Sequence, residues 1–380
     1  MKWSLLRRRG RSPEVGVVVP AYGVEQWLPE ALDSLLAQQH TTWRAVVVDD
    51  GSPDRCGEIA EEYAARDSRI TVLHTPNGGL GAARNAGTAA LDCDYLAFLD
   101  SDDVLPANAL ADLVGSLEES GSDFATGSVL RWEAPPPDGA GLHEPPWMRR
   151  LHTPGRTRAR VGEHPEILGD VFAWNKLFRR SFWDAQQLSW PEQVHYEDQP
   201  ATTRAYLAGT FDVLQAPVYH WRIRTDGSSI TQQRREVSDL VDRWATKQMA
   251  LESVLAHGDP AVTRVFVDRV LPGDLWRYFL VIPGCSDAWW ELLREGIGQL
   301  WGERSLVHSG LPPVHRSCGY LVERNRRADA EALITWFTSL TGPPPRTYDG
   351  LRLAIPGDVV RAASVPDSAL EIAPHEQPRP

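Results

Sequence analysis

Apolar runs and helical spacings alternate along the first hundred residues of the chain. Positions 15–19, 45–48 and 95–99 are filled with apolar residues, many of them β-branched, which is typical of strands buried in a sheet. Between the first two runs, the leucines and alanines over positions 28–36 recur at helical spacing. Strands that alternate with helices form a parallel sheet, so the pattern predicts an α/β fold.

Aspartates stand where two of these runs end. Asp49 and Asp50 close the second run, and Asp100, Asp102 and Asp103 close the third. Carboxylates packed this closely repel one another unless a cation neutralises them. Such oxygen clusters suit Mg²⁺ or Mn²⁺, which take one or two protein carboxylates and complete their shell with substrate phosphates. The later cluster therefore predicts a metal and diphosphate site.

The later cluster also fits a second interpretation, a solvated loop that caps a helix. Pro106 and the leucine spacing over 105–117 predict that helix, and taken alone the two interpretations are equally good. The carboxyl ends of parallel strands, however, meet at one edge of an open α/β sheet, where such folds bind their ligands. Residues 20–22, 49–50 and 100–103 are all predicted at that edge, which favours the ligand site.

Four segments in this order resemble the inverting family 2 glycosyltransferases of the GT-A fold, including bacterial cell-wall and teichoic-acid-type enzymes. The segments are residues 17–22, 48–54, 77–87 and 98–103, and the likeness extends over residues 15–232. The resemblance implies a Rossmann-like, mostly parallel sheet flanked by helices. It also implies transfer of a sugar from a nucleotide-diphosphate donor to a hydroxyl acceptor, with a divalent cation, Mg²⁺ or Mn²⁺, as cofactor.

The resemblance also implies roles for individual residues on the nucleotide side. Asp50 would contact the base and Arg84 would reach the nucleotide. Asp103 would be the principal metal ligand, assisted by Asp102. The complete nucleotide-binding set is Pro20, Ala21, Tyr22, Asp50, Gly78, Arg84, Asp100 and Asp102.

Inversion requires a base that takes the proton of the attacking hydroxyl, and residues 195–199 resemble the family's Glu-Asp motif in order and distance. By that resemblance Asp198 is the base and Glu197 supports it. The alternative is that both acids only complement the dipole of the helix predicted to begin here, an effect of about 0.3 to 1 kcal/mol. The upstream motifs favour the catalytic role.

Two further segments carry candidate substrate contacts. Trp174, Asn175 and Lys176 combine an aromatic face with hydrogen-bonding groups, and their place beside the resembled family's acceptor cleft predicts acceptor contacts. Arg222 and Arg224 resemble a loop that closes over the donor in wall-polymer glycosyltransferases. For the aromatic residues core packing competes with this interpretation, and for the arginines a solvated basic loop does.

Three other function classes fit the sequence less well than a glycosyltransferase does. The glycines at 78–81 do not follow the first strand as a dinucleotide fingerprint does, which disfavours NAD binding. A nucleotidyltransferase would need a glycine-rich, arginine-containing loop after that strand, and residues 20–23 do not form one. A non-catalytic nucleotide-sugar-binding scaffold stays open, although the presence of Asp102, Asp103 and Asp198 together argues against it.

Composition sets limits on partners and location. The net charge of −12 argues against nucleic-acid binding. The opening residues lack an apolar core long enough for a signal peptide, and about 20 apolar residues never run together. We therefore expect a cytoplasmic protein, with peripheral contact at the inner membrane face left open. Four dispersed cysteines are expected to be reduced thiols. The expected partners are a UDP- or dTDP-sugar and a glycan, a polyol-phosphate polymer or another hydroxyl acceptor.

The motifs stop near residue 232, where helical spacing takes over. We predict a basic tail over residues 1–14, the GT-A domain over 15–232, a helical C-terminal domain over 233–364 and a disordered tail over 365–380. Helices are expected over 237–249, 262–271, 288–300 and 328–340. This extension could serve acceptor selection, homodimerisation or docking to another enzyme, and the sequence does not choose among them.

Overall fold

A computed structural model of the chain describes residues 12–133, 141–224, 234–361 and 365–372. The chain divides into two compact units. The first contains residues 1–160, 172–193 and 208–223, and the second contains residues 161–171, 194–207 and 224–380. Each unit is described separately below.

The first unit is built on a mixed sheet in the order β3-β2-β1-β4-β8-β5-β9-β7, with β6 paired to β5. Strands β1 to β4 are parallel to one another, β8 runs antiparallel between β4 and β5, and β5 is parallel to β9. The strands are β1 (Val15–Ala21), β2 (Trp43–Asp49), β3 (Ile70–His74), β4 (Tyr95–Phe98), β5 (Phe124–Trp132), β6 (Leu142–His143), β7 (Arg156–Ala159), β8 (Lys176–Arg179) and β9 (Phe211–Arg222).

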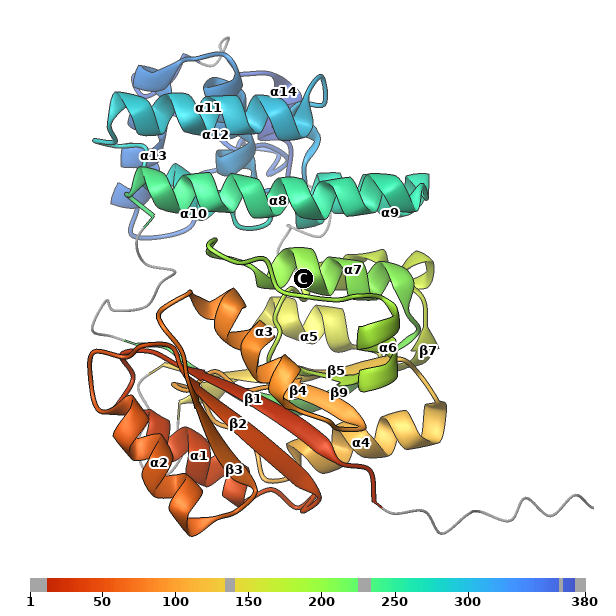
Figure 1. The fold of residues 1–380 in the computed structure, drawn as a ribbon. Helices are drawn as coiled ribbons and strands as arrows, with labels where there is room; N and C mark the ends of the chain where they lie inside the picture. Colours follow the sequence, from red (N-terminus) through yellow and green to blue (C-terminus); the bar gives the residue numbers. More distant parts are fainter. Residues whose placement is uncertain (1–11, 134–140, 225–233, 362–364, 373–380) are drawn as a thin grey trace, which may run out of the picture. The chain divides into compact units, whose positions relative to one another are not determined.

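Helices cover both faces of this sheet, because alternate residues of β1 point to opposite sides. Val15, Val17 and Val19 join a core with α1 (Leu28–Leu36), α2 (Cys56–Arg66) and α4 (Ala109–Ser120). Val18 faces α3 (Leu80–Ala90), where a Cβ on Gly87 would lie 2.4 Å from the valine. Figure 1 shows α3 on the opposite side of strands β1 to β3 from α1 and α2. The other helices of this unit are α5 (Pro146–His152) and α6 (Arg180–Ala185).

The parallel register brings the predicted strand ends to one edge. Ala21 at the end of β1 pairs with Asp49 at the end of β2, and Val18 pairs with Phe98 at the end of β4. The loop 100–103 therefore begins beside the end of β1, as the sequence predicts. The α/β fold with a mostly parallel sheet and C-terminal helices is confirmed.

The second unit is helical. It contains the 3₁₀ turns η1 (Val161–Glu163), η2 (Pro165–Gly169) and η5 (Leu306–His308), and a π-helical turn η4 (Phe266–Val270) that continues from α9. Its α-helices are α7 (Asp198–Ala208, the last residue assigned to the first unit), α8 (Val237–His257), α9 (Pro260–Val265), α10 (Leu275–Phe279), α11 (Asp287–Trp301), α12 (Pro313–Glu323), α13 (Arg327–Ser339) and α14 (Asp367–Leu370).

Residues 161–171 and 194–207 pack with the helical unit, where long-range bonds such as Tyr206 to Asp170 and Tyr196 to Asp239 hold them. The bounds 15–232 of the GT-A domain stay a prediction, and one other predicted boundary is corrected. Residues 365–372 are not a disordered tail, since Ala369 is buried and Arg316 donates to its carbonyl oxygen. Residues 1–11 and 373–380 lie outside the described residues.

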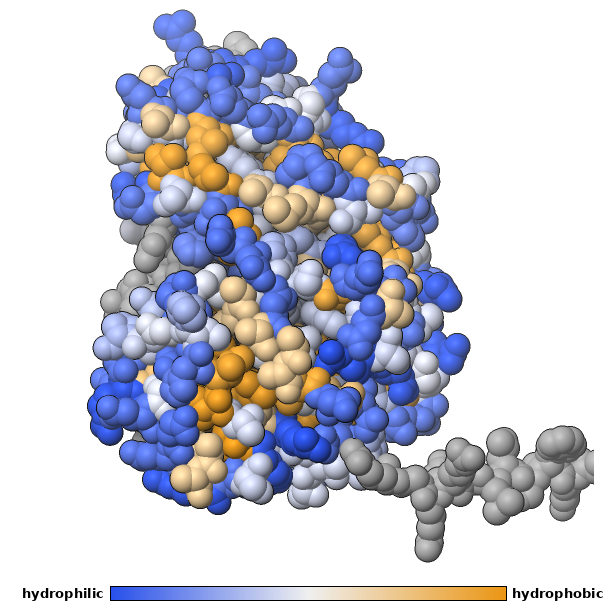
Figure 2. Space-filling view, in the orientation of Figure 1, coloured by the Kyte–Doolittle hydropathy of each residue, from blue (hydrophilic) through white to orange (hydrophobic). Residues whose placement is uncertain are grey.

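The surface of α8 carries exposed apolar side chains, which Figure 2 shows over this helix. Val237, Val241, Met249 and Leu255 are between 38% and 55% exposed. Among the described residues, no helix has both the length and the apolar character needed to cross a membrane. All four cysteines are free thiols, as expected.

Candidate active site

Asp50 holds the turn that precedes helix α3. Its Oδ1 accepts the backbone N–H of Gly78 at 2.9 Å, and its Oδ2 accepts that of Gly79 at 2.9 Å. Gly79 adopts a φ of 84°, a conformation that side chains disfavour. The backbone N–H of Asp50 donates to the carbonyl of Ala21, so the ends of β1 and β2 and the glycine turn form one connected edge. Tyr22 is 53% exposed at this edge.

The acidic loop 100–103 is bound to the end of strand β9. The Tyr219 hydroxyl accepts the N–H of Asp100 at 3.1 Å and bonds to the carboxylate of Asp103. Oδ1 of Asp103 accepts the backbone N–H of Arg222 at 2.7 Å. Val104 and His220 exchange two backbone hydrogen bonds directly beyond the loop. Strand β9 therefore fixes a loop that lies more than a hundred residues earlier in the chain.

Negative charge accumulates in this loop. Asp103 is 3% exposed, and its pKa is raised well above its usual range by burial and then by the charges of Asp102 and Asp100. Burial and the same three carboxylates also raise the pKa of Tyr219, which therefore stays protonated as a donor. A group whose charge is disfavoured in this way would be stabilised by a nearby cation.

Arg84 lies beside the acidic loop. Its Nη2 donates to Oδ1 of Asp100 at 2.7 Å, and the side chain is 1% exposed. The guanidinium lies 5.2 Å from the ring centre of Trp190, and the carbonyl of Trp190 accepts from the Asn85 amide at 2.9 Å. A Cβ on Gly81 would lie 2.0 Å from the carbonyl oxygen of Pro191, so glycine is needed where this segment crosses α3.

Arg222 is placed differently from the prediction. It is the last residue of strand β9 and not part of a loop. Its Nε donates to the carbonyl of Asp102 at 2.8 Å, and its Nη2 pairs with Glu30. Arg222 therefore stabilises the acidic loop through the carbonyl of Asp102. Arg224 is described and half-buried, whereas residues 225–231 of the predicted donor-closing loop lie outside the described residues.

The predicted acceptor residues are buried. Asn175 and Lys176 are 0% and 1% exposed, and Lys176 Nζ donates to the Phe172 carbonyl and to Oδ1 of Asn175. Trp174, 6% exposed, stacks with Tyr219 at 4.1 Å between ring centres. Lys176 begins strand β8 and Asn175 directly precedes it, so both side chains lie in the interior, and acceptor contact by them stays a prediction. Trp174 instead packs behind the tyrosine that binds the acidic loop.

The predicted base lies in the second unit. Asp198 is the first residue of helix α7, as the sequence predicts for an acidic first turn, and its side chain is half-buried. Glu197 is 4% exposed. The prediction of an acidic first turn is confirmed for Asp198, whereas Glu197 directly precedes the helix, and both acids lie in a different unit from the nucleotide edge.

Comparison with known proteins identifies the family of residues 16–185, which include most of the first unit. Residues 16–185 match the family model described as glycosyl transferase family 2. The chain carries a family 2 glycosyltransferase domain. It is similar to the uncharacterised glycosyltransferase EpsJ of Bacillus subtilis, with 34% identity over 206 residues, or 51% of this chain and 56% of EpsJ. It is also similar to the poly(ribitol-phosphate) β-N-acetylglucosaminyltransferase TarS of Staphylococcus aureus, with 29% identity over 220 residues.

The chain spans only part of these relatives, since the match covers 57% of this chain but 36% of TarS. A crystal structure of S. aureus TarS 1–349 in complex with UDP-GlcNAc superposes with a TM-score of 0.68. The superposition covers 90% of this chain and 97% of that one, at 19% identity. This likeness establishes the GT-A fold, and it extends beyond the family 2 glycosyltransferase domain into the helical unit.

The acidic loop of the glycosyltransferase domain suits a divalent cation only in part. Among the described residues, no group of three or more His, Cys, Asp or Glu side chains is arranged to hold a metal ion. Mg²⁺ and Mn²⁺ do not require such a cage, because substrate phosphates can supply the remaining ligands. The carboxylate chemistry of Asp102 and Asp103, and the raised pKa of Asp103, fit a cation that arrives with a diphosphate.

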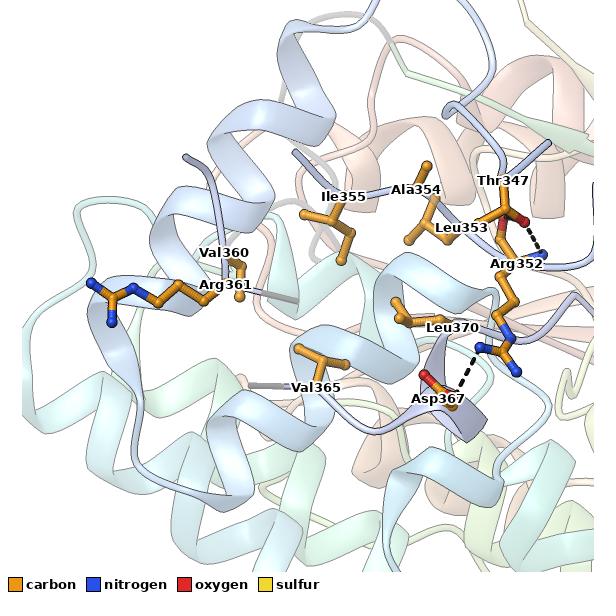
Figure 3. Close-up of a pocket in the computed structure, with 10 residues that line it drawn as sticks. All are labelled: Thr347, Arg352, Leu353, Ala354, Ile355, Val360, Arg361, Val365, Asp367 and Leu370. Atoms are coloured by element: carbon orange, nitrogen blue, oxygen red, sulfur yellow. Dashed lines mark hydrogen bonds and ion pairs between the residues drawn. The ribbon is translucent and has the colours of Figure 1, made fainter. Parts of the chain in front are cut away.

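A cavity of about 260 Å³ in the second unit is unrelated to these residues. Figure 3 shows mostly aliphatic side chains around it, with Arg361 directed away and Arg352 paired with Asp367 at 2.8 Å. None of the predicted site residues lines this cavity. Its apolar walls do not suit a nucleotide diphosphate.

Proposed function

We propose that the protein is a metal-dependent inverting glycosyltransferase that moves a sugar from a nucleotide-diphosphate donor to a hydroxyl of a cell-wall or surface glycan. The observation that carries the proposal is the acidic loop 100–103, which lies at the carboxyl edge of a family 2 glycosyltransferase sheet and contains a buried carboxylate with a raised pKa. A non-catalytic nucleotide-sugar-binding scaffold would keep the same loop, and the transfer assay described below distinguishes it from an enzyme.

On the nucleotide side, Pro20, Ala21 and Tyr22 would flank the base and Asp50 would contact it. Arg84 would act near the nucleotide while holding Asp100. Asp102 and Asp103 would hold the divalent cation, Mg²⁺ or Mn²⁺, which would stabilise negative charge on the leaving diphosphate. Tyr219 and Arg222 would keep the loop in place through the bonds described above.

On the acceptor side, Asp198 would accept the proton of the attacking hydroxyl, supported by Glu197. The C–O bond to the diphosphate breaks as the acceptor oxygen attacks from the opposite face, which inverts the anomeric centre. Trp174, with the buried Asn175 and Lys176, would shape the acceptor side through packing. Arg224 would act in a loop that closes over the donor.

We infer UDP as the favoured nucleotide, with dTDP as the alternative, because the structurally similar TarS has been crystallised with UDP-GlcNAc. A polyol-phosphate polymer is the favoured acceptor, because TarS is named for poly(ribitol-phosphate). A cytoplasmic location with peripheral contact at the inner membrane face, and a homodimer through the C-terminal helices, stay predictions.

The test is a transfer assay with UDP-GlcNAc, UDP-Glc and dTDP-sugars, with poly(ribitol-phosphate) and neutral glycans as acceptors. Wild-type protein with Mn²⁺ should form product of inverted configuration, observed by NMR. Asp198→Asn should retain donor binding and lose about 10² to 10⁴-fold in kcat. Turnover near wild type in Asp198→Asn would remove Asp198 as the base, and a retained anomeric configuration would contradict the inverting mechanism.

A further inference from the structure

The two residues that precede Glu197 and Asp198 are bound to helix α8. The Tyr196 hydroxyl donates to Oδ1 of Asp239 at 2.8 Å, and the backbone N–H of His195 donates to Oδ2 of Asp242 at 3.1 Å. Asp239 and Asp242 are three positions apart in α8, so their side chains share one face of the helix. Helix α8 therefore holds the chain directly before the acidic pair.

A second tyrosine and an arginine complete this contact. The Tyr278 hydroxyl in α10 lies 3.2 Å from the Tyr196 hydroxyl oxygen and 3.2 Å from Oδ2 of Asp239. Arg243, one turn after Asp239, lies 4.7 Å from the centre of the Tyr196 ring. Burial raises the pKa of Tyr196 to about 12, so near neutral pH its hydroxyl keeps the proton that it donates to Asp239. We call Tyr196, Asp239 and Tyr278 the clamp.

Helix α8 carries buried charged side chains on the face that includes the clamp residue Asp239. Asp239, Arg243 and Lys247 recur every four residues and are 2%, 7% and 0% exposed. Asp274 accepts from Nε of Arg243 and from Nζ of Lys247, each at 2.7 Å. Well-packed apolar residues would often be as stable at such positions, because buried charges must be desolvated. The directional hydrogen bonds of such a network constrain the side chains that they join, as a positioning role requires.

The backbone of Tyr196 supports the same interpretation. Its φ of 67° lies in the left-handed region, which residues other than glycine seldom adopt. Such conformations persist where the surrounding structure determines them, and they gather at functional sites. Two residues later the chain enters the first turn of α7 at Asp198.

We propose that the clamp positions Glu197 and Asp198 for the transfer reaction and that the Arg243, Asp274 and Lys247 network holds the clamp in place. This inference rests on the proposed function, because it takes Asp198 as the base. It gives helix α8 a role in holding the acidic pair. The clamp residues are positioning residues, because they would act through the acidic pair.

Tyr196→Phe tests the clamp, because it removes the hydroxyl and keeps the ring beside Arg243. We expect kcat to fall at least tenfold while the donor KM changes less than twofold. Hydrogen exchange of the backbone amides of residues 195–199, followed by mass spectrometry, should become at least tenfold faster. Asp239→Asn keeps an acceptor oxygen and should retain more activity than Asp239→Ala.

Tyr63→Phe is the matched control, since it removes a tyrosine hydroxyl that donates to Oδ1 of Asp33 at 2.8 Å in the first unit. The Tm of Tyr63→Phe should fall by about as much as the Tm of Tyr196→Phe, while the kcat of Tyr63→Phe stays within twofold of wild type. A wild-type kcat in Tyr196→Phe would overturn the clamp. So would a loss of kcat that tracks the loss of Tm equally in Tyr196→Phe and Tyr63→Phe.

Asp198→Asn separates failure of the clamp from failure of the proposed function. An active Asp198→Asn variant would overturn the proposed base, and with it the catalytic role of the clamp. An inactive Asp198→Asn variant combined with a fully active Tyr196→Phe variant would overturn the clamp alone. Unchanged amide exchange over residues 195–199 in Tyr196→Phe would also overturn it, whatever the activity.

Discussion

Buried charge is treated in opposite ways in the two units of this protein. In the acidic loop of the first unit, burial and neighbouring carboxylates together raise the pKa of Asp103. In the second unit burial alone would raise the pKa of Asp274, but Arg243 and Lys247 lower it well below its usual range. In the network of Arg243, Lys247 and Asp274, the protein itself supplies the positive charges that neutralise the carboxylate. The acidic loop would gain from a further positive charge, as a bound cation would supply.

The largest expected effect on stability comes from removing the charge of Asp274, the carboxylate that pairs with both Arg243 and Lys247. Asp274→Asn leaves Arg243 and Lys247, 8% and 0% exposed, buried beside a neutral amide. Breaking a fully buried pair costs about 3–5 kcal/mol, and because Asp274 is itself 28% exposed the loss should lie at or below the lower end of that range. Urea unfolding followed by tryptophan fluorescence measures the loss in the free energy of unfolding. Asp329→Asn is the control, because its pair with Arg326 is about one-third exposed and should contribute less than about 1 kcal/mol. Equal losses in the two variants would contradict the comparison.

His315 sharpens the comparison, because the second unit buries it uncharged. Neither ring nitrogen has a hydrogen-bond partner among the described residues, and burial lowers its pKa from 6.5 to about 4. Between pH 6.5 and 4 the unfolded chain binds more protons at this residue, so stability should fall as the pH falls through that window, by up to about 3 kcal/mol. Thermal unfolding of wild type and His315→Phe at pH 7 and pH 4.5 measures the effect. An equal acid-induced loss in both proteins would exclude His315 as its source.

Removing the charge of Asp103 should raise the free energy of unfolding, whereas removing the charge of Asp274 should lower it. Because its pKa is raised in the folded state, its charge destabilises the metal-free protein at neutral pH. Asp103→Asn keeps an oxygen that can accept from Arg222 and removes the charge, so we expect a gain in the free energy of unfolding in metal-free buffer. The gain should disappear when Mn²⁺ and UDP are added, because only wild type would bind them. A loss of stability in metal-free Asp103→Asn, measured by urea unfolding, would contradict an unbalanced loop.

The sequence predicts the parts of the site that lie at strand ends. Asp50 and residues 100–103 follow apolar runs of their own, so local patterns suffice to place them at one sheet edge. Tyr219 was missed as a support of Asp103, since their contact depends on the pairing of β9 and joins residues far apart in the chain. The sequence shows Tyr219 as an aromatic residue beside His220, but no sequence pattern indicates that its hydroxyl contacts the acidic loop.

The second unit was harder to predict for a different reason. Helix α12 was not expected, because His315, Arg316 and Ser317 are buried there and interrupt the apolar spacing. The Glu197 and Asp198 motif was assigned to the GT-A domain by sequence order, whereas the hydrogen bonds of Tyr196 and His195 tie it to α8. Buried polar contacts of this kind leave little trace in a hydrophobic pattern.

The central claim is that the acidic loop binds a divalent cation together with a nucleotide diphosphate. Isothermal titration of UDP into wild type and Asp103→Asn, each with Mn²⁺, with Mg²⁺ and with EDTA, tests it most directly. The account predicts that wild type binds UDP at least tenfold more tightly with a divalent cation than with EDTA, and that Asp103→Asn loses this dependence. Equal UDP affinity in wild type with and without the cations would contradict it.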